Sequence, residues 1–165
     1  MRYSFYLIML LILLMSCYGR VKPVKSGFEG KPMPVIDLLS IDSSTHYSTK
    51  DISEGKPTLL FAFETWCPYC KAQTQSLISN PDVFKDVNIY MVCNSQFSQF
   101  RKFYNDYKLS KYSNIKIGID YNHTFANYFK SADVPYMAVY DKNKNLKEIR
   151  IGKTSITTIK KIALN

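Results

Sequence analysis

Apolar residues between positions 30 and 165 follow two kinds of pattern, and the two kinds alternate along the chain. Short apolar runs bounded by turn-forming residues predict strands at residues 35–39, 58–63, 87–94, 137–140 and 146–151. Apolar positions at helical spacing predict helices at residues 68–80, 98–107, 124–129 and 155–164. Strands that alternate with helices, followed by a hairpin and a last helix, predict an α/β sandwich whose mixed central sheet is flanked by helices.

Four aromatic residues lie along one face of the predicted helix 98–107 or just before it. They are Phe97, Phe100, Tyr104 and Tyr107. An aromatic stripe at this spacing is typical of a helix that packs against a sheet, so we interpret it as core rather than as a cofactor site.

The first 16 residues carry a different pattern. Arg2 precedes the run FYLIMLLILLM at residues 5–15. A helix needs about 20 apolar residues to cross a bilayer, so this run is too short to span one. A basic start, a short apolar stretch and then small residues are typical of a secretory signal.

The sequence LMSC at residues 14–17 resembles the lipobox of bacterial lipoproteins. This resemblance implies cleavage before Cys17 and lipid attachment to that residue, which would hold the protein on a membrane surface. We therefore expect a lipoprotein signal peptide at residues 1–16, a flexible tether at 17–29 and one folded domain at 30–165, facing the periplasm of a bacterial cell envelope.

Composition and charge restrict the possible functions. The chain is 46% hydrophobic and 15% aromatic, which is enough for one ordinary core, and its 4 cysteines are too few for a disulfide-stapled miniprotein. Its 22 basic and 13 acidic residues give a net charge of +9. The lysines are dispersed and no nucleic-acid-binding motif is present, so we interpret the charge as a solvated basic surface without a nucleic-acid partner.

The segment Trp66-Cys67-Pro68-Tyr69-Cys70 stands where a predicted buried strand ends and a helix begins. Backbone N–H groups are unpaired at a helix N-terminus, and the helix dipole is positive there, so a thiol at this point is stabilised as the thiolate. Cys67 is thus the candidate nucleophile. Cys70 lies one turn further on the same face, within reach of Cys67, and is the candidate resolving thiol. Pro68 suits the first helical turn.

Three other interpretations of the two cysteines fit the sequence less well. A zinc site needs a second pair of ligands, but His46 and His123 are isolated in the sequence. A structural disulfide across three residues would close a very small loop and stabilise the fold little. Two core cysteines placed by chance would not account for Trp66 and Pro68. A redox dithiol fits best, and we interpret Cys93, in a predicted buried strand, as an inert core thiol.

Residues 62–70, the segment Asp133-Val134-Pro135 and the closing hairpin and helix resemble the thioredoxin superfamily. The opening GKPMP followed by VIDL at residues 30–38 also resembles membrane-tethered thiol–disulfide oxidoreductases of the TlpA/ResA type. The resemblance implies a thioredoxin-like fold with an N-terminal strand extension. It also implies that Pro135 is cis, packs against the dithiol and keeps metals away from it, while the Val134 backbone pairs with an extended substrate. Trp66, Pro68 and Tyr69 would complete the substrate site.

Two acidic residues of the related families are replaced in this chain. Phe61 stands where thioredoxins carry a buried Asp, and Gln73 stands where members of the ResA type often have a Glu. The proton acceptor for Cys70 is therefore open. Glu64 is a candidate, although strand alternation would point it away from Phe61 and Phe63.

The sequence thus predicts a protein-disulfide reductase that needs no metal or organic cofactor. The family resemblance implies that a membrane thiol-transfer protein supplies its electrons. A disulfide oxidase or isomerase of the same class stays open, because the sequence does not fix the reduction potential. A glutaredoxin and a DsbA architecture fit poorly, since neither glutathione-binding features after Pro135 nor room for a large helical insertion is present. A non-catalytic protein that binds a peptide, or Cu(I) through Cys67, Cys70 and Met137, is the alternative from another class.

Overall fold

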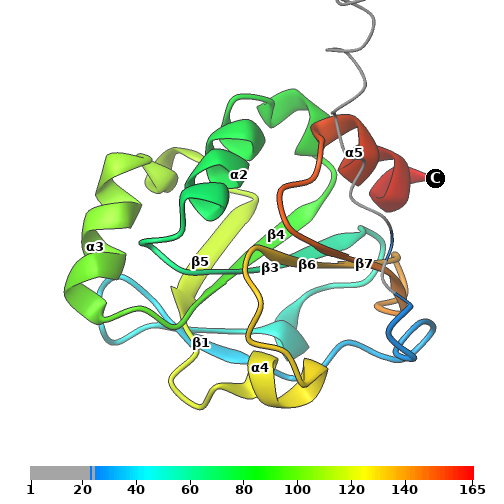
Figure 1. Cartoon of the computed structure of the whole chain (residues 1–165), viewed down its shortest axis with the longest axis horizontal. Helices are drawn as coiled ribbons and strands as arrows, with labels where there is room; N and C mark the ends of the chain where they lie inside the picture. The colour runs from blue at the N-terminus through cyan, green and yellow to red at the C-terminus, as the bar shows by residue number, and fades with distance from the viewer. Residues whose placement is uncertain (1–22, 24) are drawn as a thin grey trace, which may run out of the picture.

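A seven-stranded mixed sheet forms the centre of the molecule, which is described by a computed structural model for residues 23 and 25–165 (Figure 1). The strands lie in the order β2-β1-β5-β4-β3-β6-β7. Their bounds are β1 Asp37–Leu39, β2 His46–Ser48, β3 Thr58–Phe63, β4 Asn88–Cys93, β5 Ile115–Ile119, β6 Tyr136–Tyr140 and β7 Leu146–Ile151. The predicted mixed α/β architecture, including strands added at the N-terminal side, is confirmed.

Strand directions bring four loops to one edge of the sheet. β3 pairs with β4 in parallel, β4 pairs with β5 in parallel, and β3 pairs with β6 antiparallel. The carboxyl ends of β3, β4 and β5 and the amino end of β6 therefore lie along the same edge, which we call the carboxyl edge. All six residues of β3 are buried, in keeping with its uninterrupted apolar sequence.

Helices cover both faces of the sheet unequally. The helices are α2 Pro68–Ile78, α3 Phe97–Asp106, α4 Thr124–Phe129 and α5 Ile156–Leu164, with short 3-10 turns at Thr49–Asp51, Pro81–Phe84 and Leu109–Lys111. α2, α3 and α5 pack on one face through residues such as Leu77, Phe100 and Ile159. α4 lies on the other face, as Figure 1 shows, and packs there through Phe125 and Phe129. The four aromatic residues predicted to pack on the sheet do so, with Phe100 fully buried.

Two strands of the sheet were not predicted. β2 is only three residues long, too short to show a period. β5 alternates isoleucine with Lys116 and Gly118, a signal weakened by the glycine. A Cβ on Gly118 would lie 2.6 Å from the Leu39 carbonyl oxygen, so the glycine allows β1 to approach β5. The helix predicted to Asn80 ends at Ile78, because Pro81 disfavours helical geometry in the residue before it.

The segment before β1 runs along the turn between β6 and β7. Phe28 packs against Phe129 with ring centroids 5.5 Å apart. The Gly30 N–H donates to the Leu146 carbonyl oxygen at 2.8 Å, and the Leu146 N–H donates to the Lys31 carbonyl oxygen at 2.9 Å. The predicted signal peptide and Cys17 lie outside the described residues. Within the part of the chain that the structure describes, no helix is both long enough and apolar enough to cross a bilayer.

Candidate active site

The two thiols stand at the carboxyl edge, where β3 passes into α2. Cys67 is the N-cap residue of α2, and its sulfur accepts a hydrogen bond from the Cys70 N–H at 3.3 Å. Pro68 occupies the first helical turn, as predicted, where its missing N–H leaves no intrahelical bond unmade. The Cys67 sulfur therefore takes the place that a Ser or Asp oxygen fills at an ordinary helix start.

Burial separates the two cysteines chemically. Cys67 is 4% exposed and Cys70 is fully buried, and both are free thiols. Burial raises the pKa of Cys70 well above its ordinary range, and the Cys67 side chain raises it further. Cys70 therefore keeps its proton at neutral pH unless a base accepts it.

The Val134–Pro135 segment lies beside the dithiol. The peptide bond between these residues is cis, as the thioredoxin resemblance implied. The Cys67 Sγ donates to the Val134 carbonyl oxygen at 3.9 Å, across 67 positions of sequence. Trp66 and Tyr69 flank the thiols on the surface and are 68% and 65% exposed. The structure thus brings the predicted site residues of both segments together.

Glu64 and Ser95 form a polar pair at the carboxyl edge that the sequence did not predict. The Ser95 hydroxyl donates to a Glu64 carboxylate oxygen and accepts from the Thr65 N–H at 3.0 Å. The Glu64 carbonyl oxygen accepts from the Cys67 N–H at 3.2 Å. β3 ends at Phe63, so strand alternation does not determine where Glu64 points, and its negative charge is one of the causes that raise the pKa of Cys70. Because β3 and β4 pair in parallel, the residues that follow each strand lie side by side. This register could have predicted that Ser95 lies beside Glu64.

Cys93 lies beneath the same polar pair. It is fully buried at the end of β4, where its sulfur accepts from the Ser95 N–H at 3.4 Å. Burial raises its pKa to about 11. The thiol is therefore protonated at neutral pH, which agrees with the interpretation of Cys93 as a core residue.

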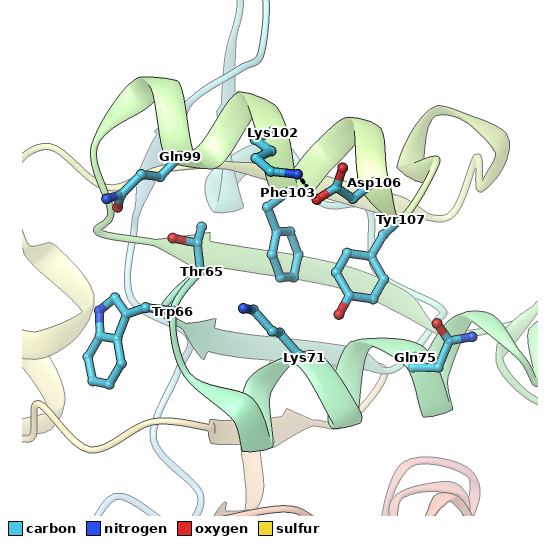
Figure 2. A pocket seen from close by; sticks show the side chains of 9 residues that line it. All are labelled: Thr65, Trp66, Lys71, Gln75, Gln99, Lys102, Phe103, Asp106 and Tyr107. Carbon is cyan, nitrogen blue, oxygen red and sulfur yellow. Dashed lines mark hydrogen bonds and ion pairs between the residues drawn. The ribbon is translucent and has the colours of Figure 1, made fainter.

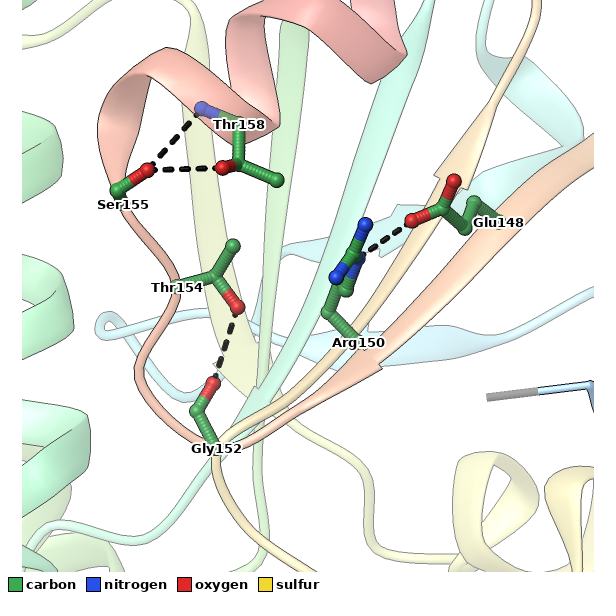
Figure 3. A network of polar contacts seen from close by, with 6 residues as sticks. All are labelled: Glu148, Arg150, Gly152, Thr154, Ser155 and Thr158. Atoms are coloured by element: carbon green, nitrogen blue, oxygen red, sulfur yellow. Dashed lines mark hydrogen bonds and ion pairs between the residues drawn. The ribbon is translucent and has the colours of Figure 1, made fainter. Parts of the chain in front are cut away.

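Gln73 connects the helix of the dithiol to the loop before α5. It lies one turn after Cys70 and is fully buried, and its Oε1 accepts from the Thr154 N–H at 2.8 Å. Its Nε2 has no hydrogen-bond partner among the described residues. Figure 3 shows the same loop, in which the Thr154 hydroxyl bonds to the Gly152 carbonyl oxygen and Ser155 caps α5 as predicted. Sequence analysis identified Gln73 only as a residue that replaces an acid of related proteins. It did not predict the hydrogen bond to Thr154.

Side chains that could bind a metal ion are scattered over the described part of the chain. No three His, Cys, Asp or Glu side chains there lie close enough together to hold one. His46 is exposed at the start of β2, and His123 precedes α4 with φ of 52°. Met137, considered as a Cu(I) ligand, is fully buried in β6.

The fold and the site together define a thioredoxin-like protein, and comparison with known proteins agrees. Residues 30–149 match the AhpC/TSA family, and the chain belongs to that family. The thioredoxin domain of a thiol-disulfide oxidoreductase from Bacteroides vulgatus superposes with a TM-score of 0.65 at 17% identity, covering 82% of this chain and 97% of that one. StoA from Bacillus subtilis superposes with a TM-score of 0.61 at 19% identity, covering 81% and 98%.

Curated relatives are similar over a shorter segment. The thiol:disulfide interchange protein DsbE of Escherichia coli (strain K12) is 40% identical over 55 residues, which is 33% of this chain and 30% of that protein. DsbE of Tatumella citrea is 42% identical over 55 residues, with the same coverage. The chain thus matches about a third of the length of these relatives.

Proposed function

We propose that the protein is a thiol–disulfide oxidoreductase that reduces disulfides of other proteins in the bacterial cell envelope. The observation that carries this proposal is the position of the Cys67 sulfur. It caps α2, accepts the Cys70 N–H and lies beside the Val134 carbonyl oxygen. Membership of the AhpC/TSA family and the partial similarity to DsbE proteins support it.

The reaction proceeds by two thiol–disulfide exchanges. The Cys67 thiolate attacks one sulfur of the substrate disulfide, forms a mixed disulfide and displaces the other substrate sulfur as a thiolate. Cys70 then loses its proton and attacks the Cys67 sulfur, which releases the second substrate thiolate and leaves a Cys67–Cys70 disulfide. The substrate gains two electrons and the protein loses two. A membrane thiol-transfer protein would supply two electrons to restore the dithiol.

We assign Glu64 as the base that accepts the proton of Cys70. Phe61 and Gln73 provide no acid where related proteins carry one, whereas the Glu64 carboxylate lies near enough to affect Cys70 electrostatically. Ser95 holds that carboxylate by a hydrogen bond. A base at this point compensates for the burial that keeps Cys70 protonated.

The substrate chain would bind around the exposed rim of the dithiol. Val134 and Pro135 would pair with its extended backbone, and Trp66, Pro68 and Tyr69 would contact its side chains. The large exposed surfaces of Trp66 and Tyr69 support this role, since exposed aromatic residues beside a reactive group suit protein recognition.

We also propose that Cys17 carries the lipid that holds the protein on a membrane, with the domain in the periplasm. The lipobox-like sequence at residues 14–17 supports this proposal. Metabolic labelling with a fatty-acid analogue should mark the wild-type protein and not the Cys17→Ala variant. Labelling of both proteins would disprove the anchor.

The catalytic proposal is tested by insulin reduction and by trapping. The reduced protein should reduce insulin disulfides catalytically with dithiothreitol as donor, and Cys70→Ala should accumulate substrate adducts on Cys67 because the second exchange cannot occur. Redox titration of the Cys67–Cys70 pair against glutathione buffers separates reductase from oxidase, since a strongly oxidising pair indicates oxidase or isomerase. If the protein retains stoichiometric copper through dialysis and does not reduce insulin, the proposal of an enzyme is wrong and a Cu(I) carrier is indicated.

A further inference from the structure

A cleft of about 570 Å³ opens beside the dithiol, between α2 and α3. Trp66 lies at one end of it, and the cleft follows α3 away from there (Figure 2). Trp66 directly precedes Cys67 and Lys71 directly follows Cys70 in the sequence, although neither cysteine itself lines the cleft. A protein segment in disulfide exchange with Cys67 could extend into it.

The walls of the cleft combine aromatic and amide groups. Phe103 and Tyr107 point from α3 toward α2, with ring centroids 4.5 Å apart. The Gln99 side chain, at the end near Trp66, bonds to no other described residue. Aromatic walls beside the unpaired Gln99 amide suit an extended peptide, which offers both side chains and backbone groups to bind.

The charges in the cleft do not balance. Lys102 forms an ion pair with Asp106 at 2.8 Å, so these two charges offset each other. The Lys71 side chain has no hydrogen-bond or ion-pair partner among the residues that the structure describes. Figure 2 shows its side chain extending from α2 into the space between the helices. The cleft therefore holds one uncompensated positive charge close to the dithiol.

We propose that this cleft binds the acidic flank of a protein disulfide substrate, with a substrate carboxylate paired to Lys71. This inference rests on the proposed thiol–disulfide exchange and adds the class of substrate to it. A second copy of this chain is a poor occupant, because a net charge of +9 makes copies repel one another. An acidic partner is attracted by the same charge.

The test uses three peptides that contain the same intramolecular disulfide and differ at two residues beside the attacked cysteine. One carries two Glu, one two Gln and one two Lys. The reduced full-length protein is mixed with each peptide in excess, the reaction is stopped with acid, and the oxidised protein is counted by mass spectrometry. The readout is the rate constant for the Glu peptide divided by that for the Gln peptide. This ratio cancels any change that a substitution makes in the intrinsic reactivity of the protein's own thiols.

The wild-type ratio should be about twofold to fivefold, the effect of a partly exposed ion pair. It should approach one as the salt concentration rises from about 20 mM to about 500 mM. Lys71→Gln should bring the ratio close to one, and Lys71→Glu should make the Lys peptide the fastest of the three. Lys142→Glu makes the same charge change in the turn between β6 and β7, far from the cleft, and should keep the wild-type ratio.

Equal rate constants for the three peptides with the wild-type protein would overturn the proposed cleft specificity and leave the oxidoreductase function intact. Reaction with none of them would instead count against the oxidoreductase function. An acidic preference that persists in Lys71→Gln, or disappears equally in Lys142→Glu, would show that the net charge of the chain and not this cleft selects the substrate.

Discussion

Replacing Gln73 by Met tests the connection between the helix of the dithiol and the loop before α5. Met has a similar length and no oxygen, so the variant loses the acceptor for the Thr154 N–H without a large cavity. Thr154 is 3% exposed, and a buried N–H without an acceptor costs about 1–3 kcal/mol. The unpaired Gln73 Nε2 is removed at the same time, which recovers part of that cost. We expect the free energy of unfolding to fall by about 1–2 kcal/mol.

Replacing Gln73 by Glu supplies a matched test, because a carboxyl oxygen can still accept from the Thr154 N–H. Burial disfavours the charged carboxylate, so the pKa of the new group should be higher in the folded protein than in the unfolded chain. The folded state then binds more protons, and the variant should match the wild type below about pH 4, the unfolded pKa. Its stability relative to wild type should decrease as the pH rises through the folded pKa.

Urea unfolding of the reduced protein, followed by circular dichroism at several pH values, measures both effects. Gln75→Met, at a more exposed position of α2, is the control for the loss of an amide from the helix. If Gln73→Met changes the free energy of unfolding by less than about 0.5 kcal/mol, the range of ordinary surface substitutions, the Thr154 bond does not hold the loop. A Gln73→Glu variant with the same pH profile as wild type would contradict the pKa argument.

Three further predictions concern the carboxyl edge and the sheet. Glu64→Gln keeps an acceptor for Ser95 but removes the base that would accept the proton of Cys70. The attack of Cys70 on a mixed disulfide at Cys67 should therefore slow about a hundredfold. A faster attack in this variant would show that the Glu64 charge only raises the pKa of Cys70. Gly118→Ala should lower the free energy of unfolding by about 2–3 kcal/mol, because the new methyl group would clash with the β1 backbone. Urea titration that shows no loss of stability would mean that β1 moves aside. Cys93 should resist iodoacetamide at pH 8 until the protein unfolds, because it is buried and its pKa is raised to about 11. Peptide mapping that finds Cys93 labelled in the native protein would refute its burial.

Local sequence was sufficient to predict the parts of the fold that depend on local pattern. The uninterrupted apolar run of β3 and the helix start at Pro68 follow from period and capping chemistry, and the bounds of β3 agree with the prediction residue for residue. The predicted nearness of Cys67 to Val134 came from a family resemblance, because no local pattern links positions 67 residues apart.

Contacts between distant segments account for what the sequence did not reveal. Ser95 meets Glu64 only because β3 and β4 pair in parallel, and Gln73 meets Thr154 across 81 positions. The cleft beside Trp66 depends on how α3 packs next to α2, which residue spacing within either helix does not determine. Such features can be predicted only when the register of the strands and the packing of the helices on the sheet are known.

The path of β6 has a consequence for how the protein would work on a surface. This strand runs from Pro135, next to the reactive sulfur, to the turn where Lys31 bonds to Leu146, a span of about 15 Å. A lipid attached upstream of Lys31 would therefore be joined to the domain at the end of β6 remote from the dithiol. The anchor would then leave the space around the dithiol free for substrate proteins.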